Sequence, residues 1–212
     1  MENQIPAILF DLDGTLINTT PDIALAVNAV RTIYELKKLT DEVVGSAVGN
    51  GATELLKCCF PEELHDELDK IRQLFIQEYS KHLCHLSHPF QGVEEAIVRL
   101  KQRAPLGIVT NKPQHLTLQL LDALQWTHHF QIVVGGDLLS ERKPSPVPLL
   151  HAVKQLGSRP SNTVFIGDTE VDAKAAQAAN IAFIAVPYGR VAPAVEAGYF
   201  GSLARVASIS TI

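Results

Sequence analysis

The chain has 212 residues, of which 46% are hydrophobic and 19% charged, and this composition is typical of a globular protein with a core of its own. Eighteen basic and 23 acidic residues give a net charge of −5, which excludes a general nucleic-acid-binding surface but allows a small basic pocket. Three cysteines are too few for a disulfide framework, the first residues lack the basic start of a signal peptide, and no apolar run reaches the ~18 residues of a membrane span. We therefore expect a cytoplasmic protein with no nucleic-acid and no membrane partner.

Five short apolar runs, rich in β-branched residues, predict buried strands at 5–10, 106–109, 132–134, 163–166 and 181–186. Each run is continuous rather than alternating, which is typical of a parallel sheet covered on both faces. Apolar residues at helical spacing occupy 93–100, 116–124, 149–156 and 171–179, so that helices and strands alternate. This order predicts an α/β fold with a Rossmann-like parallel sheet and helices on both of its faces.

The interval between the first two predicted strands breaks this alternation. Residues 17–86 carry helical patterns and no strong strand signal. The interval is far longer than the dozen or so residues that a crossover between parallel strands needs. We expect a small helical cap domain, residues 17–86, inserted after the first strand of a core domain made of residues 1–16 and 87–212. His88-Pro89 and Gly92 would form the hinge by which the chain returns to the core.

Polar residues follow the carboxyl ends of the predicted strands, where sites form in open α/β sheets. In chain order they are Asp11-Leu12-Asp13-Gly14-Thr15, then Thr110-Asn111-Lys112, then Lys143 in a loop, then Gly167-Asp168-Thr169 with Asp172 one turn later. Because the carboxyl ends of parallel strands share one edge of the sheet, these segments should meet there.

The carboxylates in these segments suit metal-assisted phosphoryl transfer. Asp11, Asp13 and Asp168 offer the oxygen ligands that Mg²⁺ prefers. Asp11 and Asp13 are two residues apart, so one can attack phosphorus while the other handles a proton. This arrangement predicts a reaction that passes through an aspartyl-phosphate.

The remaining polar residues suit the binding of a phosphate. Thr110, Asn111 and the helix N-terminus that follows them would donate hydrogen bonds to its oxygens, and Lys143 would add a positive charge. Asp172 has three roles open to it, since it can bind the metal through water, orient Lys143, or face the solvent.

Four motifs carry a family resemblance. Asp11-Leu12-Asp13-Gly14-Thr15-Leu16 resembles the first motif of the haloacid dehalogenase superfamily. The other three motifs are matched in the same order along the chain by Thr110, by Lys143 and by Gly167-Asp168-Thr169-Glu170-Val171-Asp172. Within that superfamily the chain is similar to the bacterial phosphoglycolate phosphatases, through 16–22, Gly49-Asn50-Gly51-Ala52, Gly135-Gly136-Asp137 and 142–146. It departs from their pattern at Asn18, where Asp is frequent, and at Ser145, where His is frequent.

The resemblance implies Mg²⁺-dependent hydrolysis of a small phosphate monoester, 2-phosphoglycolate, by a monomer or a homodimer. It makes Asp11 the nucleophile and Asp13 the acid and base, with Mg²⁺ held by Asp11, Asp168 and the main-chain carbonyl of Asp13. It also suggests a cap loop that faces the substrate, formed by Gly49, Asn50 and Gly51.

Other interpretations compete with a phosphatase. A sugar phosphomutase of the same superfamily would return the phosphoryl group to its substrate, and the sequence does not distinguish it. A phospho-acceptor like a response-regulator receiver would lack the insertion, which disfavours that interpretation. A calcium loop is rejected because its glycine would stand at the sixth position, whereas Gly14 stands at the fourth. His82, Cys84, His85 and His88 match no standard spacing of zinc ligands.

Overall fold

The computed structural model describes residues 6–186 and residue 188. Ile5 in the first predicted strand and the two ends of the predicted core domain lie outside the described residues. A five-stranded parallel sheet forms the centre of the fold, in the order β5-β4-β1-β6-β7. Its strands are β1 (Ala7–Phe10), β4 (Leu106–Val109), β5 (Ile132–Val134), β6 (Thr163–Gly167) and β7 (Ala182–Ala185).

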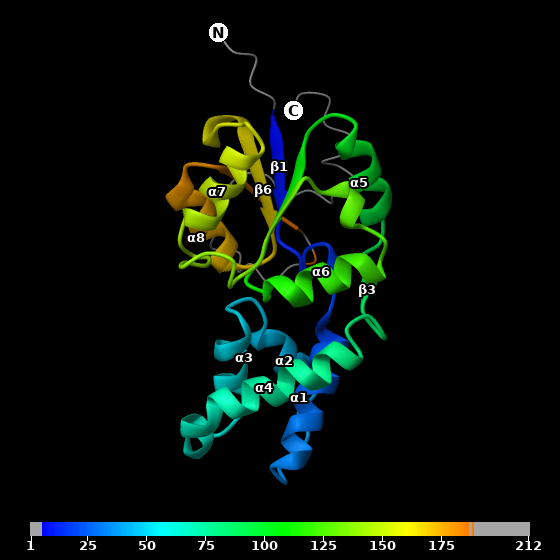
Figure 1. Cartoon of the computed structure of the whole chain (residues 1–212), viewed down its shortest axis with the longest axis vertical. Helices are drawn as coiled ribbons and strands as arrows, with labels where there is room; N and C mark the ends of the chain where they lie inside the picture. The colour runs from blue at the N-terminus through cyan, green and yellow to red at the C-terminus, as the bar shows by residue number, and fades with distance from the viewer. Residues whose placement is uncertain (1–5, 187, 189–212) are drawn as a thin grey trace.

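Helices cover both faces of this sheet, because successive side chains of each strand point in opposite directions. Leu9 of β1 packs against α7 (Val147–Gln155) and α8 (Glu170–Ala179), whereas its neighbours Ile8 and Phe10 belong to the core on the other face. That second face is covered by α5 (Val93–Lys101) and α6 (Gln114–Ala123), as Figure 1 shows. The continuous apolar runs thus lie in a doubly covered sheet, and the predicted fold class is confirmed.

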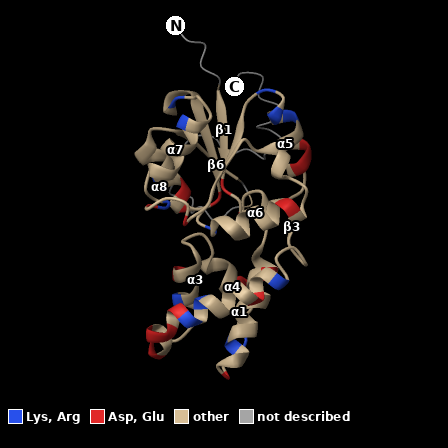
Figure 2. Ribbon diagram, viewed as in Figure 1, with Lys and Arg blue, Asp and Glu red and all other residues tan. Residues whose placement is uncertain are grey.

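Four further helices gather beyond the carboxyl ends of the strands (Figure 1). They are α1 (Thr20–Ile33), α2 (Asp41–Ala47), α3 (Ala52–Cys59) and α4 (Leu68–Lys81). Short 3-10 helices lie at η1 (Glu62–Glu67), η2 (Thr127–His129) and η3 (Pro160–Asn162). Ile23 and Val27 of α1 and Ile71 and Phe75 of α4 are buried in one core cluster, so their apolar faces hold these helices together. Charged residues of both signs occur along these helices (Figure 2).

Two very short strands mark the place where the chain leaves and re-enters the sheet domain. β2 (Ile17–Asn18) pairs antiparallel with β3 (His88–Pro89), so the predicted hinge at His88-Pro89 is a strand rather than a loop. A two-residue strand is too short to show any periodicity, which is why the sequence did not reveal it. The buried Asp22 carboxylate ties the two passages together, because it accepts hydrogen bonds from the main-chain N–H groups of Leu86 and Ser87 and from the Ser87 hydroxyl.

Across the described residues, each helix is too short or too polar to cross a membrane.

Candidate active site

The polar segments predicted from the sequence do meet at one edge of the sheet. Asp11 follows β1 and donates its main-chain N–H to Ile166 of β6, at 2.8 Å. Thr110 follows β4 and donates in the same way to Val134 of β5, at 2.9 Å. Asp168 follows β6, and all three of these side chains are buried. The parallel ladder therefore continues one residue past the strands, which holds the functional side chains in place.

Lys143 lies at the centre of the acidic residues. Its ammonium nitrogen is 2.8 Å from Oδ1 of Asp11 and 2.6 Å from Oδ1 of Asp172, and only 3% of its surface is exposed. Burial by itself lowers the pKa of Lys143, but Asp11 and Asp172 outweigh it and raise that pKa above its ordinary value. The ammonium is therefore a fixed positive charge beside Asp11.

Asp172 is buried, so it does not face the solvent. While Oδ1 holds Lys143, Oδ2 accepts from the hydroxyl of Thr169 at 2.6 Å and from its main-chain N–H at 3.0 Å, which completes a capping box at the start of α8. Of the three roles that the sequence left open for Asp172, the structure contains the contact needed for one, the orientation of Lys143.

Three carboxylates, those of Asp11, Asp168 and Asp172, each place an oxygen within 4.8 Å of the other two. Burial is the main cause that raises the pKa of Asp11 to about 7; Lys143 opposes this rise, and the nearby Asp172 and Asp168 add to it. One lysine does not balance three acids, so the arrangement favours an additional cation. Carboxylate oxygens are the ligands that Mg²⁺ prefers, and the donor set therefore fits this ion. Thr15 fixes Asp168 by donating its hydroxyl hydrogen to Oδ1, at 2.9 Å.

The Asp13 carboxylate stands apart from this group and has a cation of its own. Its Oδ1 is 3.1 Å from the ammonium nitrogen of Lys112. That ammonium also donates to the hydroxyl of Tyr79 in α4, at 2.6 Å, so one side chain joins the sheet edge to the helices beyond it. Burial lowers the pKa of Lys112, but Asp13 and Tyr79 overcome this effect and raise it to about 12.

Neither Lys112 nor Tyr79 was assigned a role from the sequence. Lys112 belongs to the predicted polar segment Thr110-Asn111-Lys112, and Tyr79 lies within the predicted helical insertion, residues 17–86. A tyrosine at the end of a buried face needs a partner for its hydroxyl, and this was the one signal available.

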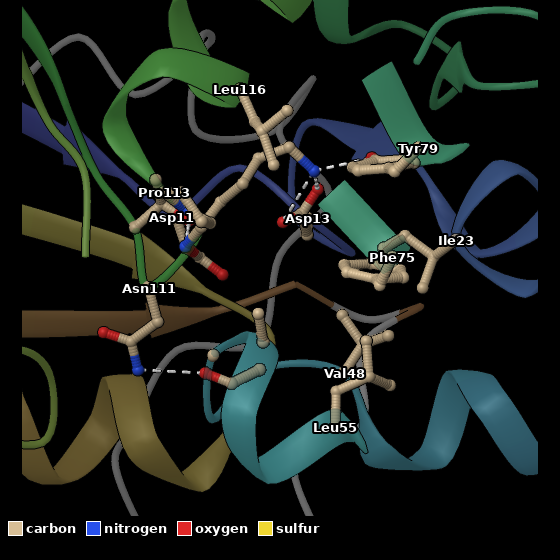
Figure 3. A pocket seen from close by; sticks show the side chains of 15 residues that line it. Asp11, Asp13, Ile23, Val48, Leu55, Phe75, Tyr79, Asn111, Pro113 and Leu116 are labelled. Carbon is tan, nitrogen blue, oxygen red and sulfur yellow. Dashed lines mark hydrogen bonds and ion pairs between the residues drawn. The ribbon is translucent and has the colours of Figure 1, made fainter. Parts of the chain in front are cut away.

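A cavity of about 40 Å³ lies between the sheet edge and the helices α1, α3 and α4. Figure 3 shows Asp11, Asp13 and Asn111 on one side of it, and Phe75 and Leu55 on the other. Thr110 also lines the cavity, while its hydroxyl oxygen accepts from the main-chain N–H of Lys112 at 3.2 Å. The walls contributed by α1, α3 and α4 are mainly apolar.

Asn111 ties the loop between α2 and α3 to the sheet domain. Its side-chain amide donates to the carbonyl of Gly49 at 3.0 Å and to that of Lys143 at 2.9 Å, while Oδ1 is buried and has no hydrogen-bond partner among the described residues. Gly49 and Gly51 line the cavity and both have positive φ angles. Asn50 is exposed and lines a different depression, beside Thr169, so the sharp turn at the two glycines carries its side chain away from the cavity.

Gly136 leaves room for the segment that carries Thr110 and Asn111. A Cβ atom at Gly136 would fall well inside van der Waals contact with the main chain of Asn111. We expect Gly136→Ala to lower the free energy of unfolding by ~1–3 kcal/mol, as overpacking typically does, and to lower activity as well. Urea unfolding and steady-state kinetics check this. Wild-type values for both would show that the segment with Thr110 and Asn111 can move to accommodate the added methyl group at no cost.

Cysteine and histidine form no comparable group in the part of the chain that the structure describes. There the one cluster of potential metal ligands is the carboxylate trio. The rings of His82 and His85 are 6.1 Å apart at the surface, and His88 lies in β3. Cys59 is buried in the core, while Cys58 is exposed.

Comparisons with known proteins identify the family of this chain. Residues 8–186 match the family model described as haloacid dehalogenase-like hydrolase. A phosphoglycolate phosphatase of Chromobacterium violaceum is 39% identical over 191 residues, which are 87% of this chain and 86% of that protein. An N-acetylmuramic acid 6-phosphate phosphatase of Pseudomonas aeruginosa is 32% identical over 94% of this chain and 89% of that protein.

Among solved structures, a predicted phosphoglycolate phosphatase of Haemophilus somnus superposes with a TM-score of 0.88 at 30% identity, covering 99% of both chains. The resemblance predicted from the four motifs is confirmed. The chain belongs to the haloacid dehalogenase-like hydrolase family.

Proposed function

We propose that this hydrolase acts on a small phosphate monoester, 2-phosphoglycolate, and releases glycolate and phosphate through an aspartyl-phosphate. The observation that carries the proposal is the position of the Asp11 carboxylate. It lines the cavity, and its Oδ1 is 2.8 Å from the ammonium nitrogen of Lys143. A carboxylate fixed beside a buried cation is suited to attack a phosphorus whose oxygens that cation attracts. The names of the similar bacterial proteins support the same substrate.

Each proposed role follows from a position in the site. Asp11 forms the bond to phosphorus while the ester bond breaks, and Thr110 and Lys143 hold the phosphoryl oxygens. Asp13 gives its proton to the departing alkoxide and later takes one from the water that attacks the aspartyl-phosphate. Asn111 holds the cap loop beside the phosphate position.

The metal proposal rests on the buried carboxylates. Asp11, Asp168 and the main-chain carbonyl of Asp13 would hold Mg²⁺, which supplies positive charge that attracts the substrate phosphate. Asp172 holds Lys143 and caps α8 with its two oxygens, so we assign it to positioning.

The cavity supports a small leaving group. We assign residues 17–86 to a cap that excludes bulk water and residues 1–16 and 87–212 to the core, with Gly49 and Gly51 as the parts of the cap loop nearest the substrate. About 40 Å³ suits glycolate better than a sugar such as N-acetylmuramic acid, the leaving group named for the Pseudomonas aeruginosa relative.

A substrate panel tests this function. We expect 2-phosphoglycolate to have the highest kcat/KM among 2-phosphoglycolate, N-acetylmuramic acid 6-phosphate, a hexose phosphate and an aryl phosphate, with one inorganic phosphate released per substrate consumed. A higher kcat/KM for the amino-sugar phosphate would replace the substrate, and a phosphate ester as product would indicate a mutase. No turnover of any ester, aryl phosphate included, would instead favour a phospho-acceptor.

Activity should require a divalent cation. Without one, the three clustered carboxylates repel the phosphate of the substrate. Titration with a chelator is expected to abolish hydrolysis of 2-phosphoglycolate, and added Mg²⁺ should restore it. Full activity in excess chelator would contradict the metal role of Asp168.

A further inference from the structure

Lys112 is the one cation among the described residues that line the cavity. Lys143 is not among the residues that line the cavity, and it contacts Asp11 at the phosphoryl end of the site. Around Lys112 the cavity is walled by apolar side chains, among them Ile23, Phe75 and Leu116 (Figure 3). A positive charge in such a place is costly unless anionic or polar groups surround it.

The ammonium of Lys112 has hydrogen-bonding capacity that its neighbours do not exhaust. It carries three N–H donors. One reaches the Tyr79 hydroxyl at 2.6 Å, and the other two face the Asp13 carboxylate, at 3.1 Å from Oδ1 and 3.4 Å from Oδ2. The 3.4 Å contact with Oδ2 is long for such a hydrogen bond, so the donor that faces Oδ2 can turn to a ligand in the cavity while Oδ1 keeps Asp13 paired with the ammonium.

Tyr79 holds this ammonium in position. Its ring centroid is 4.4 Å from the Lys112 nitrogen and 5.6 Å from the centroid of the stacked Phe75 ring, and the Tyr79 side chain is buried. The charge is thus fixed before any substrate binds. A fixed charge favours substrates whose anionic group lies at the matching position.

Building on the function proposed above, we propose that Lys112 binds a carboxylate of the leaving group and selects phosphate esters that carry it one carbon from the ester oxygen. Asp13 delivers its proton to that ester oxygen, and Lys112 adjoins Asp13. A carboxylate separated from the ester oxygen by a single carbon therefore falls within reach of the Lys112 N–H donor that faces Oδ2 of Asp13. The same carboxylate placed elsewhere in the cavity would be buried against apolar walls without a partner.

The test compares two esters of the same size, 2-phosphoglycolate and its neutral amide, 2-phosphoglycolamide. For the wild-type chain we expect kcat/KM to favour the acid by ~10²-fold, as for a charge-assisted hydrogen bond. Lys112→Met is expected to bring this ratio close to one. Any damage to Asp13 or to folding lowers both rates and cancels in the ratio. Lys57→Met, which removes an exposed lysine of α3, is the matched control and should keep the wild-type ratio.

Two further variants keep the proposal open to refutation. Lys112→Gln is neutral but can still hydrogen bond to both Tyr79 and Asp13, so it serves if Lys112→Met does not fold, and it too should lose the preference. Lys112→Arg retains the charge and should keep most of the preference for the acid. A wild-type ratio near one, or an unchanged ratio in the neutral variants, would overturn the proposal.

Failure of the proposed substrate remains distinguishable from failure at Lys112. If the chain hydrolyses some other phosphate ester, the acid and its amide are compared as competitive inhibitors of that activity, which requires no turnover of either. Tighter inhibition by the acid that disappears in Lys112→Gln would support the role of Lys112, and equal inhibition would refute it.

Discussion

Asp11→Asn is expected to abolish both turnover and covalent labelling, whereas Asp13→Asn should slow turnover yet still become phosphorylated. An amide oxygen is too weak a nucleophile to form the bond to phosphorus, so the first variant stops before the intermediate. Asp13 moves only protons, a contribution of typically 10²–10⁴-fold. With a nitrophenyl phosphate, whose leaving group needs no protonation, the first step of Asp13→Asn should be largely spared and the aspartyl-phosphate should accumulate.

The measurement is rapid-quench trapping of the phosphorylated protein, followed by the time course of its decay. Labelling of Asp11→Asn together with no labelling of Asp13→Asn would reverse the assignment of nucleophile and acid. Loss of labelling in both variants would instead place both carboxylates in the first step.

The same two variants should differ in stability, and in opposite senses. Asp11→Asn removes one of three neighbouring carboxylates while Lys143 keeps its contact with Asp172, so we expect no loss in the free energy of unfolding. Asp13→Asn leaves the buried ammonium of Lys112 without its anionic partner, so that free energy should fall. Urea unfolding in the presence of a chelator provides this comparison independently of activity.

Lys143→Met should lose activity and should also be less stable than the wild type. The substitution leaves Asp11, Asp168 and Asp172 buried together with no cation between them. Removing one partner from a buried ion pair typically costs ~3–5 kcal/mol, and we expect a loss of this order in the chelated protein. Because Mg²⁺ would then be the remaining source of positive charge, it should stabilise Lys143→Met more than it stabilises the wild type.

Denaturant unfolding with chelator and with Mg²⁺ measures both effects. The exposed Lys57→Met variant, which removes a charge without touching the site, is the control and should unfold as the wild type does. Equal stabilisation of Lys143→Met and wild type by Mg²⁺ would argue against a cation site beside Lys143.

Much of the fold follows from local sequence. The strands at 106–109 and 132–134 were predicted with the bounds they have in the structure, because a continuous apolar run between helical patterns signals a covered parallel strand. Gly157 and Asn180 have positive φ angles just beyond α7 and α8, and these are the residue types that commonly end helices in this way. The sequence also determined which residues would meet, because Asp11, Thr110 and Asp168 each follow a strand of one parallel sheet.

Tertiary structure alone decided how those residues pair. The sequence offered Lys143 for a phosphate, and the fold shows that it also joins Asp11 to Asp172 across long stretches of chain. Lys112 reaches Tyr79 only because the inserted helices fold back over the sheet edge, and no local pattern encodes that contact. The direction of Asn50 likewise depends on the positive φ angles of the two glycines that flank it, Gly49 and Gly51. Periodicity records which face of an element is buried, whereas the partner of a buried charge depends on packing between distant elements.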